Sequence, residues 1–139
     1  MKKPLLLHNP RCRKSREAIE FLNSNKIDFK TLLYMKDGLD KYTIEKIIQK
    51  LKINPLELIR TQEKIWKENY RSRTLNQDDL LNILVEYPNL IKRPIFITKT
   101  EAIIAIPADE ILKIYAKVKI YENKLFLLLY ENICKKLTH

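Results

Sequence analysis

Glycine and histidine are too scarce in this chain for several common enzyme motifs. The sequence has 139 residues and one glycine, Gly38, where average usage near 7% would give about ten. The G-x-G-x-x-G dinucleotide turn and the Walker A phosphate loop each need more than one glycine, so neither is present. The only histidines are His8 and His139, which excludes the H-E-x-x-H zinc proteases.

Long apolar runs and cysteine are also scarce. The longest clean apolar run, Leu125 to Tyr130, is far below the ~18 residues of a membrane span. Leu5–Leu7 is too short for the ~7–15 apolar residues of a secretion signal. We therefore expect a cytoplasmic protein with no membrane partner. In that compartment Cys12 and Cys134, the two cysteines, are expected to be reduced thiols.

The chain carries a net charge of +10, which predicts attraction to anions but says nothing about the fold. A small domain often keeps such charge on solvated lysine-rich faces. No run of five or six like charges is present, so nucleic acid is not the favoured partner.

Apolar patterning predicts an α/β fold. Residues 4–8 form a short apolar strand, a helix starts near Ser15, and a second strand covers 29–34. A strand, a helix and a strand within about thirty residues are typical of a right-handed unit with parallel strands. Two later apolar runs, 95–98 and 102–106, predict an antiparallel hairpin. Together these elements favour a mixed four-stranded sheet flanked by helices.

A helical segment is expected to be inserted between the second and third strands. Isoleucine and leucine recur with helical spacing from Ile44 to Leu51. Asn54 and Pro55 have the pattern of a helix N-terminus, and this helix is predicted to carry Arg60 near its end. Asn76 is expected to begin a further helix that stops before Pro88.

We divide the chain into a domain over residues 1–116 and a basic C-terminal extension over residues 117–139. Pro107 is expected to open the last helix of the domain. Within the extension, Lys117–Ile120 alternates like a strand, but the apolar spacing from Leu125 onward fits an amphipathic helix. We expect a terminal helix that packs on the domain.

The segment from His8 to Arg16 is the strongest candidate for chemistry. It places Cys12 in a loop before the first predicted helix, among several cationic side chains. Free N–H groups and the positive end of the helix dipole favour a thiolate there. Together with Arg13 and Arg16, the same N–H groups are suited to bind a tetrahedral oxyanion. His8 is a candidate to set the protonation of the thiol.

Other interpretations of Cys12 remain open. It can be a small core residue in a basic loop, or a zinc ligand with His8, Cys134 and His139, although a site that uses the chain end is disfavoured. We expect no metal site. Position 15 is Ser15, so there is no C-x-x-C dithiol, and the C-x5-R phosphatase loop is absent as well.

Three segments resemble one known family, the thioredoxin-fold arsenate reductases that use glutathione and glutaredoxin. They are His8–Arg16, Asn54–Arg60 and Ile91–Ile95. The resemblance implies a thioredoxin-like sheet, Cys12 as the nucleophile, and two oxyanion ligands, Arg60 and Arg93. It also implies a cis peptide before Pro94 that faces the thiol. The implied supporting residues are His8, Asn9, Ser15, Arg16 and Pro94.

The resemblance further implies a small oxyanion substrate, no bound cofactor, and glutathione or glutaredoxin as the external reductant. These reductases usually carry a third anion-binding arginine where this chain has Ile106. Losing one charge-assisted contact, about 1.5–3 kcal/mol, weakens arsenate binding by about tenfold to a hundredfold. Two alternatives therefore stay open. One is a related glutathione-dependent thiol reductase without arsenate activity. The other is a redox-sensing regulator of the Spx type that contacts RNA polymerase and usually carries C-x-x-C.

Overall fold

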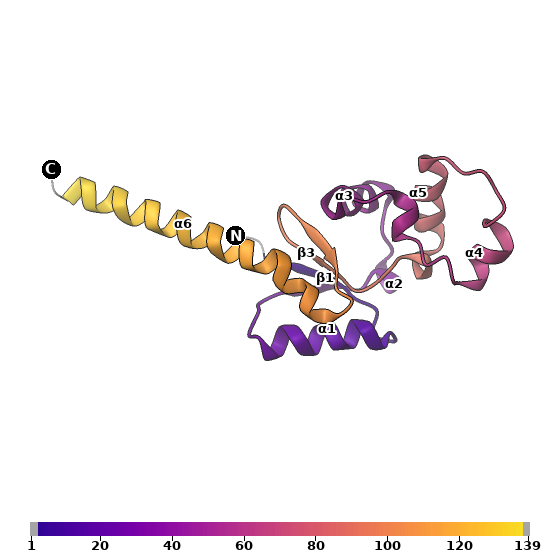
Figure 1. The fold of residues 1–139 in the computed structure, drawn as a ribbon, viewed down its shortest axis with the longest axis horizontal. Coiled ribbons are helices and arrows are strands. Elements are labelled where there is room, and N and C mark those ends of the chain that lie inside the picture. The colour runs from indigo at the N-terminus through magenta and orange to yellow at the C-terminus, as the bar shows by residue number, and fades with distance from the viewer. Residues whose placement is uncertain (1–2, 138–139) are drawn as a thin grey trace.

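A central four-stranded sheet organises the molecule in the computed structural model, which describes residues 3–137 (Figure 1). The strand order is β2-β1-β3-β4, with β1 parallel to β2 and antiparallel to β3, and with β3 antiparallel to β4. This confirms the predicted mixed sheet and its hairpin. The strands are β1 (Leu5–Leu7), β2 (Lys30–Leu32), β3 (Ile95–Ile97) and β4 (Ala102–Ile104).

Residues 1 and 2 of the predicted domain and residues 138 and 139 of the predicted C-terminal extension lie outside the described residues. His139, one of the ligands in the zinc alternative, is among them.

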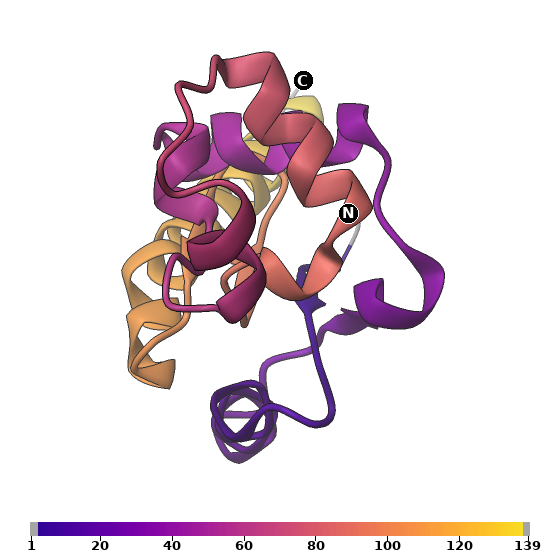
Figure 2. The ribbon, with the colours of Figure 1, turned by 90° about the vertical axis from the view of Figure 1, so that its right-hand side faces the viewer.

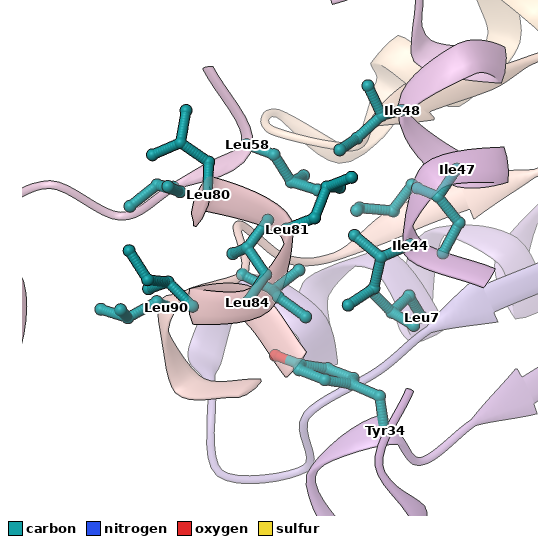
Figure 3. Close-up of a cluster of buried hydrophobic side chains, with 14 of the residues drawn as sticks. Leu7, Tyr34, Ile44, Ile47, Ile48, Leu58, Leu80, Leu81, Leu84 and Leu90 are labelled. Carbon is teal, nitrogen blue, oxygen red and sulfur yellow. The ribbon is translucent and has the colours of Figure 1, made fainter. Parts of the chain in front are cut away.

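The two faces of the sheet bury separate apolar clusters because successive strand residues point to opposite faces. On one face, Leu6 and Phe96 pack with α1 (Arg13–Ser24) and with the start of the C-terminal helix. On the other face, Leu7 and Ile95 pack with the inserted helices. Figure 3 shows this second cluster around Tyr34, Ile44 and Leu84.

The inserted segment covers one face of the sheet with short helices whose ends are capped by side chains. The Asp40 carboxylate accepts a hydrogen bond from the Thr43 N–H at the start of α3. Asn76 and Asp79 form a capping box at the start of α5. Gly38 ends α2 with φ 72°, a conformation that favours glycine. The elements are α2 (Tyr34–Asp37), α3 (Lys41–Leu51), η1 (Pro55–Leu58), α4 (Lys64–Asn69), α5 (Gln77–Glu86) and η2 (Pro88–Leu90).

Two predicted boundaries in this region are wrong. The second strand ends at Leu32, and Tyr34 begins α2 instead of ending the strand. The element opened by Pro55 is a 3-10 turn that stops at Leu58, so Arg60 lies beyond it. The reason is a long-range contact, since Ile59 takes an extended conformation and pairs with Ile91.

The C-terminal segment forms one continuous helix, α6 (Leu112–Leu137), after η3 (Ala108–Ile111). Residues 117–137 belong to this helix, and the Lys117 ammonium pairs with the Glu101 carboxylate at 3.2 Å, whereas packing of the extension on the domain stays a prediction. Within α6 only Ile114 is buried, and the helix runs past the sheet and away from it (Figure 1). Leu125–Tyr130 is apolar at six successive positions, which lie all around a helix and give no single face for packing.

No helix within residues 3–137 is both long enough and apolar enough to cross a bilayer.

Candidate active site

The loop between β1 and α1 holds Cys12 at the N-cap of α1, as predicted. Cys12 has an extended backbone, with φ −92° and ψ 124°, and its carbonyl oxygen accepts from the Arg16 N–H at 3.1 Å. The Cys12 N–H donates to the Asn9 carbonyl at 2.9 Å, and the Arg11 N–H donates to the Asn9 side chain at 3.1 Å. The loop therefore fixes the backbone on both sides of the thiol.

Ser15 holds this loop against the first turn of the helix. Its side chain is fully buried, and its hydroxyl oxygen accepts from the Asn9 N–H at 3.3 Å. Asn9 is also buried. The two residues, predicted as supporting groups, therefore join the loop that carries Cys12 to the first turn of α1.

The Cys12 pKa lies below its usual value. Partial burial of the thiol, the largest single influence, raises the pKa, but donors around the sulfur together outweigh it. They are the Ser15 N–H, the Arg93 guanidinium, the Lys14 N–H and the Ser15 hydroxyl. Hydrogen bonds to a thiolate favour the charged form, so the site favours the nucleophilic state.

Three of the four neighbouring cations, which the sequence suggested as activators, are engaged elsewhere. Arg13 and Lys14 both pair with Glu17, at 3.1 and 3.4 Å. Arg16 donates to the Pro10 carbonyl at 2.9 Å and so braces the loop. The cation that lowers the Cys12 pKa is Arg93, which is distant in sequence.

His8 follows β1 and its side chain is buried. The His8 backbone N–H donates to the Leu32 carbonyl at 3.0 Å. Burial is the main cause that lowers its pKa, so the imidazole is neutral at pH 7. His8 is not among the main influences on the Cys12 thiol. Its role as a protonation partner stays a prediction.

Arg60 and Arg93 are brought together by an antiparallel pairing of two loops. The Arg60 N–H donates to the Leu90 carbonyl at 2.7 Å, and the Lys92 N–H donates to the Leu58 carbonyl at 2.9 Å. Both guanidinium groups then donate to the Asn89 carbonyl, at 3.3 Å from Arg60 and 2.8 Å from Arg93. The two predicted oxyanion ligands thus share one anchor, and Arg93 is the one that reaches Cys12.

Arg60 has a second partner that the sequence analysis missed. The Glu63 carboxylate accepts from the Arg60 guanidinium at 2.8 Å, and each side chain is about one-third exposed. The Glu63 charge therefore offsets the Arg60 charge in the free protein. The i, i+3 spacing of Arg60 and Glu63 is the sequence signal that could have identified this ion pair.

The Arg93–Pro94 peptide is cis, as predicted, and so is Ile106–Pro107. The Pro94 carbonyl accepts from the Ala105 N–H at 2.9 Å, which sets Ile106 beside the Arg93–Pro94 segment. The Ile106 side chain is 44% exposed. The position where the resemblance expects a third arginine therefore lies at the edge of the site.

Tyr34 is a further site residue that the sequence analysis missed. Its side chain is fully buried at the start of α2, and its hydroxyl has no hydrogen-bond partner. Burial raises its pKa to about 12, and the charges of Arg93, Cys12 and Arg60 also act on it. The sequence position of Tyr34, just after the carboxyl end of a parallel strand, could have identified it as a site residue. Ligand sites in α/β sheets lie at that end of the strands.

Cys134 lies far from this arrangement. It belongs to the C-terminal end of α6, which is remote from the N-terminal end of α1 (Figure 1). Figure 2 shows the molecule from the side of α4 and α5, with α6 running away behind them. Among the described residues neither cysteine forms a disulfide, and the geometry brings one thiol to the site.

Comparisons with known proteins point to one family. The ArsC family model matches residues 7–114. The Escherichia coli protein YfgD is 33% identical over 78% of this chain and 93% of its own length. An arsenate reductase from Haemophilus influenzae is 31% identical over 79% of this chain and 97% of its own.

A solved structure and a regulator extend the comparison. An arsenate reductase from Vibrio cholerae matches with a TM-score of 0.76 and 28% identity, over 80% of this chain and 96% of its own. The global transcriptional regulator Spx 1 of Bacillus cereus is 28% identical over 76% of this chain and 82% of its own.

Proposed function

The chain belongs to the ArsC family, and on that premise we propose that it is a thiol-dependent oxidoreductase of the arsenate reductase type. Cys12 is the nucleophile, and the bound oxyanion is held by Arg93, Arg60 and the N–H groups at the start of α1. The observation that carries this proposal is the Cys12 thiol, whose pKa is lowered by the Ser15 N–H and by Arg93.

The proposed reaction begins when the Cys12 thiolate attacks arsenic(V). A Cys12 S–As bond forms, and one arsenate oxygen leaves as water. External thiols then resolve the adduct. In total, a singly charged arsenate ion, a proton and two thiols give arsenous acid, a disulfide and a water molecule. The two thiols supply the two electrons that reduce arsenic(V) to arsenic(III).

Glutathione or glutaredoxin is the proposed thiol donor. With one thiol at the site and Cys134 remote from it, the chain offers no second cysteine to release the adduct. An external thiol must therefore do so, which places the reaction in a reducing compartment such as the cytoplasm.

The experiment is turnover of arsenate with glutathione and glutaredoxin, followed as arsenite formed and disulfide produced. Wild type and Cys134→Ser should turn over, whereas Cys12→Ser should be inactive. Equal loss in both variants would indicate a relay between two thiols. No turnover in the wild type with any donor would reject arsenate as the substrate.

A second candidate is a related thiol reductase without arsenate activity. The Arg60–Glu63 ion pair and Ile106 favour it, because together they leave fewer unpaired positive charges for a polyanion. A mixed disulfide of Cys12 with glutathione, reduced by glutaredoxin, is the discriminating product. An Spx-type regulator is less favoured, because Ser15 stands where that group usually has its second cysteine.

A further inference from the structure

Three buried polar atoms near the site lack hydrogen-bond partners, and two of them have complementary chemistry. Among the described residues, these atoms are His8 Nδ1, Tyr34 Oη and Arg93 Nε. Buried polar groups are nearly always paired, and an exception at a reactive site calls for a functional explanation. Arginine Nε–H can only donate, and a phenol oxygen can accept.

The fold brings the Tyr34 and Arg93 side chains next to the same element, η2 (Pro88–Leu90). The Tyr34 ring is packed under Leu84 and Leu90, with its hydroxyl turned toward α5 and η2 (Figure 3). The middle residue of η2 is Asn89, whose carbonyl holds the Arg93 guanidinium at 2.8 Å. The charges of Arg93 and Cys12 also act on the Tyr34 pKa, which agrees with this placement.

We propose that Tyr34 is a positioning residue, whose phenol oxygen accepts a hydrogen bond from Arg93 Nε–H and so aims the remaining guanidinium donors at the Cys12 sulfur. Asn89 fixes one terminal nitrogen of Arg93, and Tyr34 fixes Nε. With two anchored donors the planar group keeps one orientation. This inference rests on the proposed function only in taking Cys12 as the nucleophile.

A phenol suits this role because it orients Arg93 without neutralising it. Burial keeps the phenol protonated, with a pKa of about 12. Glu63 anchors Arg60 with a full negative charge and so offsets that arginine's attraction for anions. Arg93 therefore keeps its charge for the thiolate and for a bound oxyanion.

The test is the pH dependence of iodoacetamide alkylation, measured on Tyr34→Phe in a Cys134→Ser background so that only Cys12 reacts. Tyr34→Phe should raise the apparent pKa of Cys12 and slow alkylation severalfold at neutral pH. The matched control is Tyr42→Phe, since Tyr42 is 67% exposed and should keep the original profile.

A double-mutant cycle separates positioning from packing. Arg93→Lys retains the charge but removes the Nε–H donor, so Tyr34→Phe should have no further effect on alkylation in that background. If the two changes add, or if Tyr34→Phe lowers stability in urea while leaving the alkylation profile unchanged, the proposal is overturned. Alkylation needs no arsenate, so failure of arsenate turnover alone leaves this inference standing.

Discussion

Arg60 and Arg93 donate to the same atom, the carbonyl oxygen of Asn89. One backbone acceptor thereby holds two like charges close together, and their repulsion is offset by its partial negative charge. The Glu63 carboxylate offsets the Arg60 charge further. The proposed anion site is thus asymmetric, because the Arg60 charge is offset by Glu63, while within residues 3–137 Arg93, next to Cys12, has no such carboxylate partner.

Replacing Glu63 by Gln should strengthen oxyanion binding. The change releases the Arg60 guanidinium from a partly exposed ion pair, and such pairs are worth about 0.2–1 kcal/mol. We therefore expect the KM for arsenate to fall by up to about fivefold, with kcat nearly unchanged. Steady-state kinetics test this, with Glu68→Gln as the control because Glu68 pairs with the exposed Lys64, away from Arg60. A higher KM in the Glu63 variant would show that this pair orients Arg60 for binding.

Replacing Ile106 by Arg should lower the KM for arsenate by about tenfold or more. Ile106 is exposed beside the Arg93–Pro94 segment, so a long cationic side chain reaches the oxyanion. The added contact to the oxyanion forms in the ground state and in the transition state alike, so kcat should stay unchanged. Ile106→Gln is the neutral control. If the wild type already has a low KM and the variant gains nothing, another cation fills the position.

The pH dependence of Cys12 alkylation by iodoacetamide should give a lower apparent pKa in the native protein than in the chain unfolded in guanidinium chloride. The thiolate is favoured by folding, so its contribution to stability is present above the unfolded-state pKa and is lost as pH falls through the native pKa. Relative to Cys12→Ser, the wild type should therefore gain stability as pH rises between these two values. Equal midpoints in the native and unfolded chains would contradict the assignment.

Ser15→Ala should weaken both the fold and the thiolate. The substitution leaves the Asn9 N–H without its acceptor in a buried loop, at a cost of about 1–3 kcal/mol in unfolding free energy. It also removes one donor that lowers the Cys12 pKa, so alkylation at neutral pH should slow. Ser24→Ala, at the exposed end of α1, should change neither the urea midpoint nor the alkylation rate.

Deleting residues 122–139 should leave the domain intact. From Ala116 to Leu137 no side chain is buried, so the melting temperature and the Cys12 alkylation profile should match those of the full chain. Deletion from Ile114 onward is the contrasting variant, because it removes a buried side chain and should destabilise the fold. A large loss of stability in the shorter deletion would show that the helix packs on the domain in solution.

Local patterns in the sequence were sufficient to predict the sheet and the position of Cys12. Short apolar runs bounded by Pro and Gly marked the strands, and the N-terminal loop sequence placed the thiol at a helix start. The resemblance supplied Arg93 and its cis peptide bond with Pro94.

What was missed depends on contacts between distant segments. Arg60 was assigned to a helix because the pairing of Ile59 with Ile91 has no local signal. The hydrogen bond from Arg93 to the Asn89 carbonyl and the packing of α2 against η2 likewise join segments that are distant in sequence. The extension was expected to pack because its apolar spacing fits an amphipathic helix, but the apolar residues from Leu125 to Tyr130 lie all around α6 and form no single face.

The long separation in sequence between Cys12 and Arg93 sets an order of events during synthesis. The loop with Cys12 leaves the ribosome first, and Arg93 follows after most of the chain has been translated. At about 5–20 residues per second this delay lasts several seconds. During that interval the nascent thiol lacks its distant guanidinium donor. We therefore expect Cys12 to react more slowly with cellular electrophiles until β3 has joined the sheet, and its full reactivity to appear only after that step.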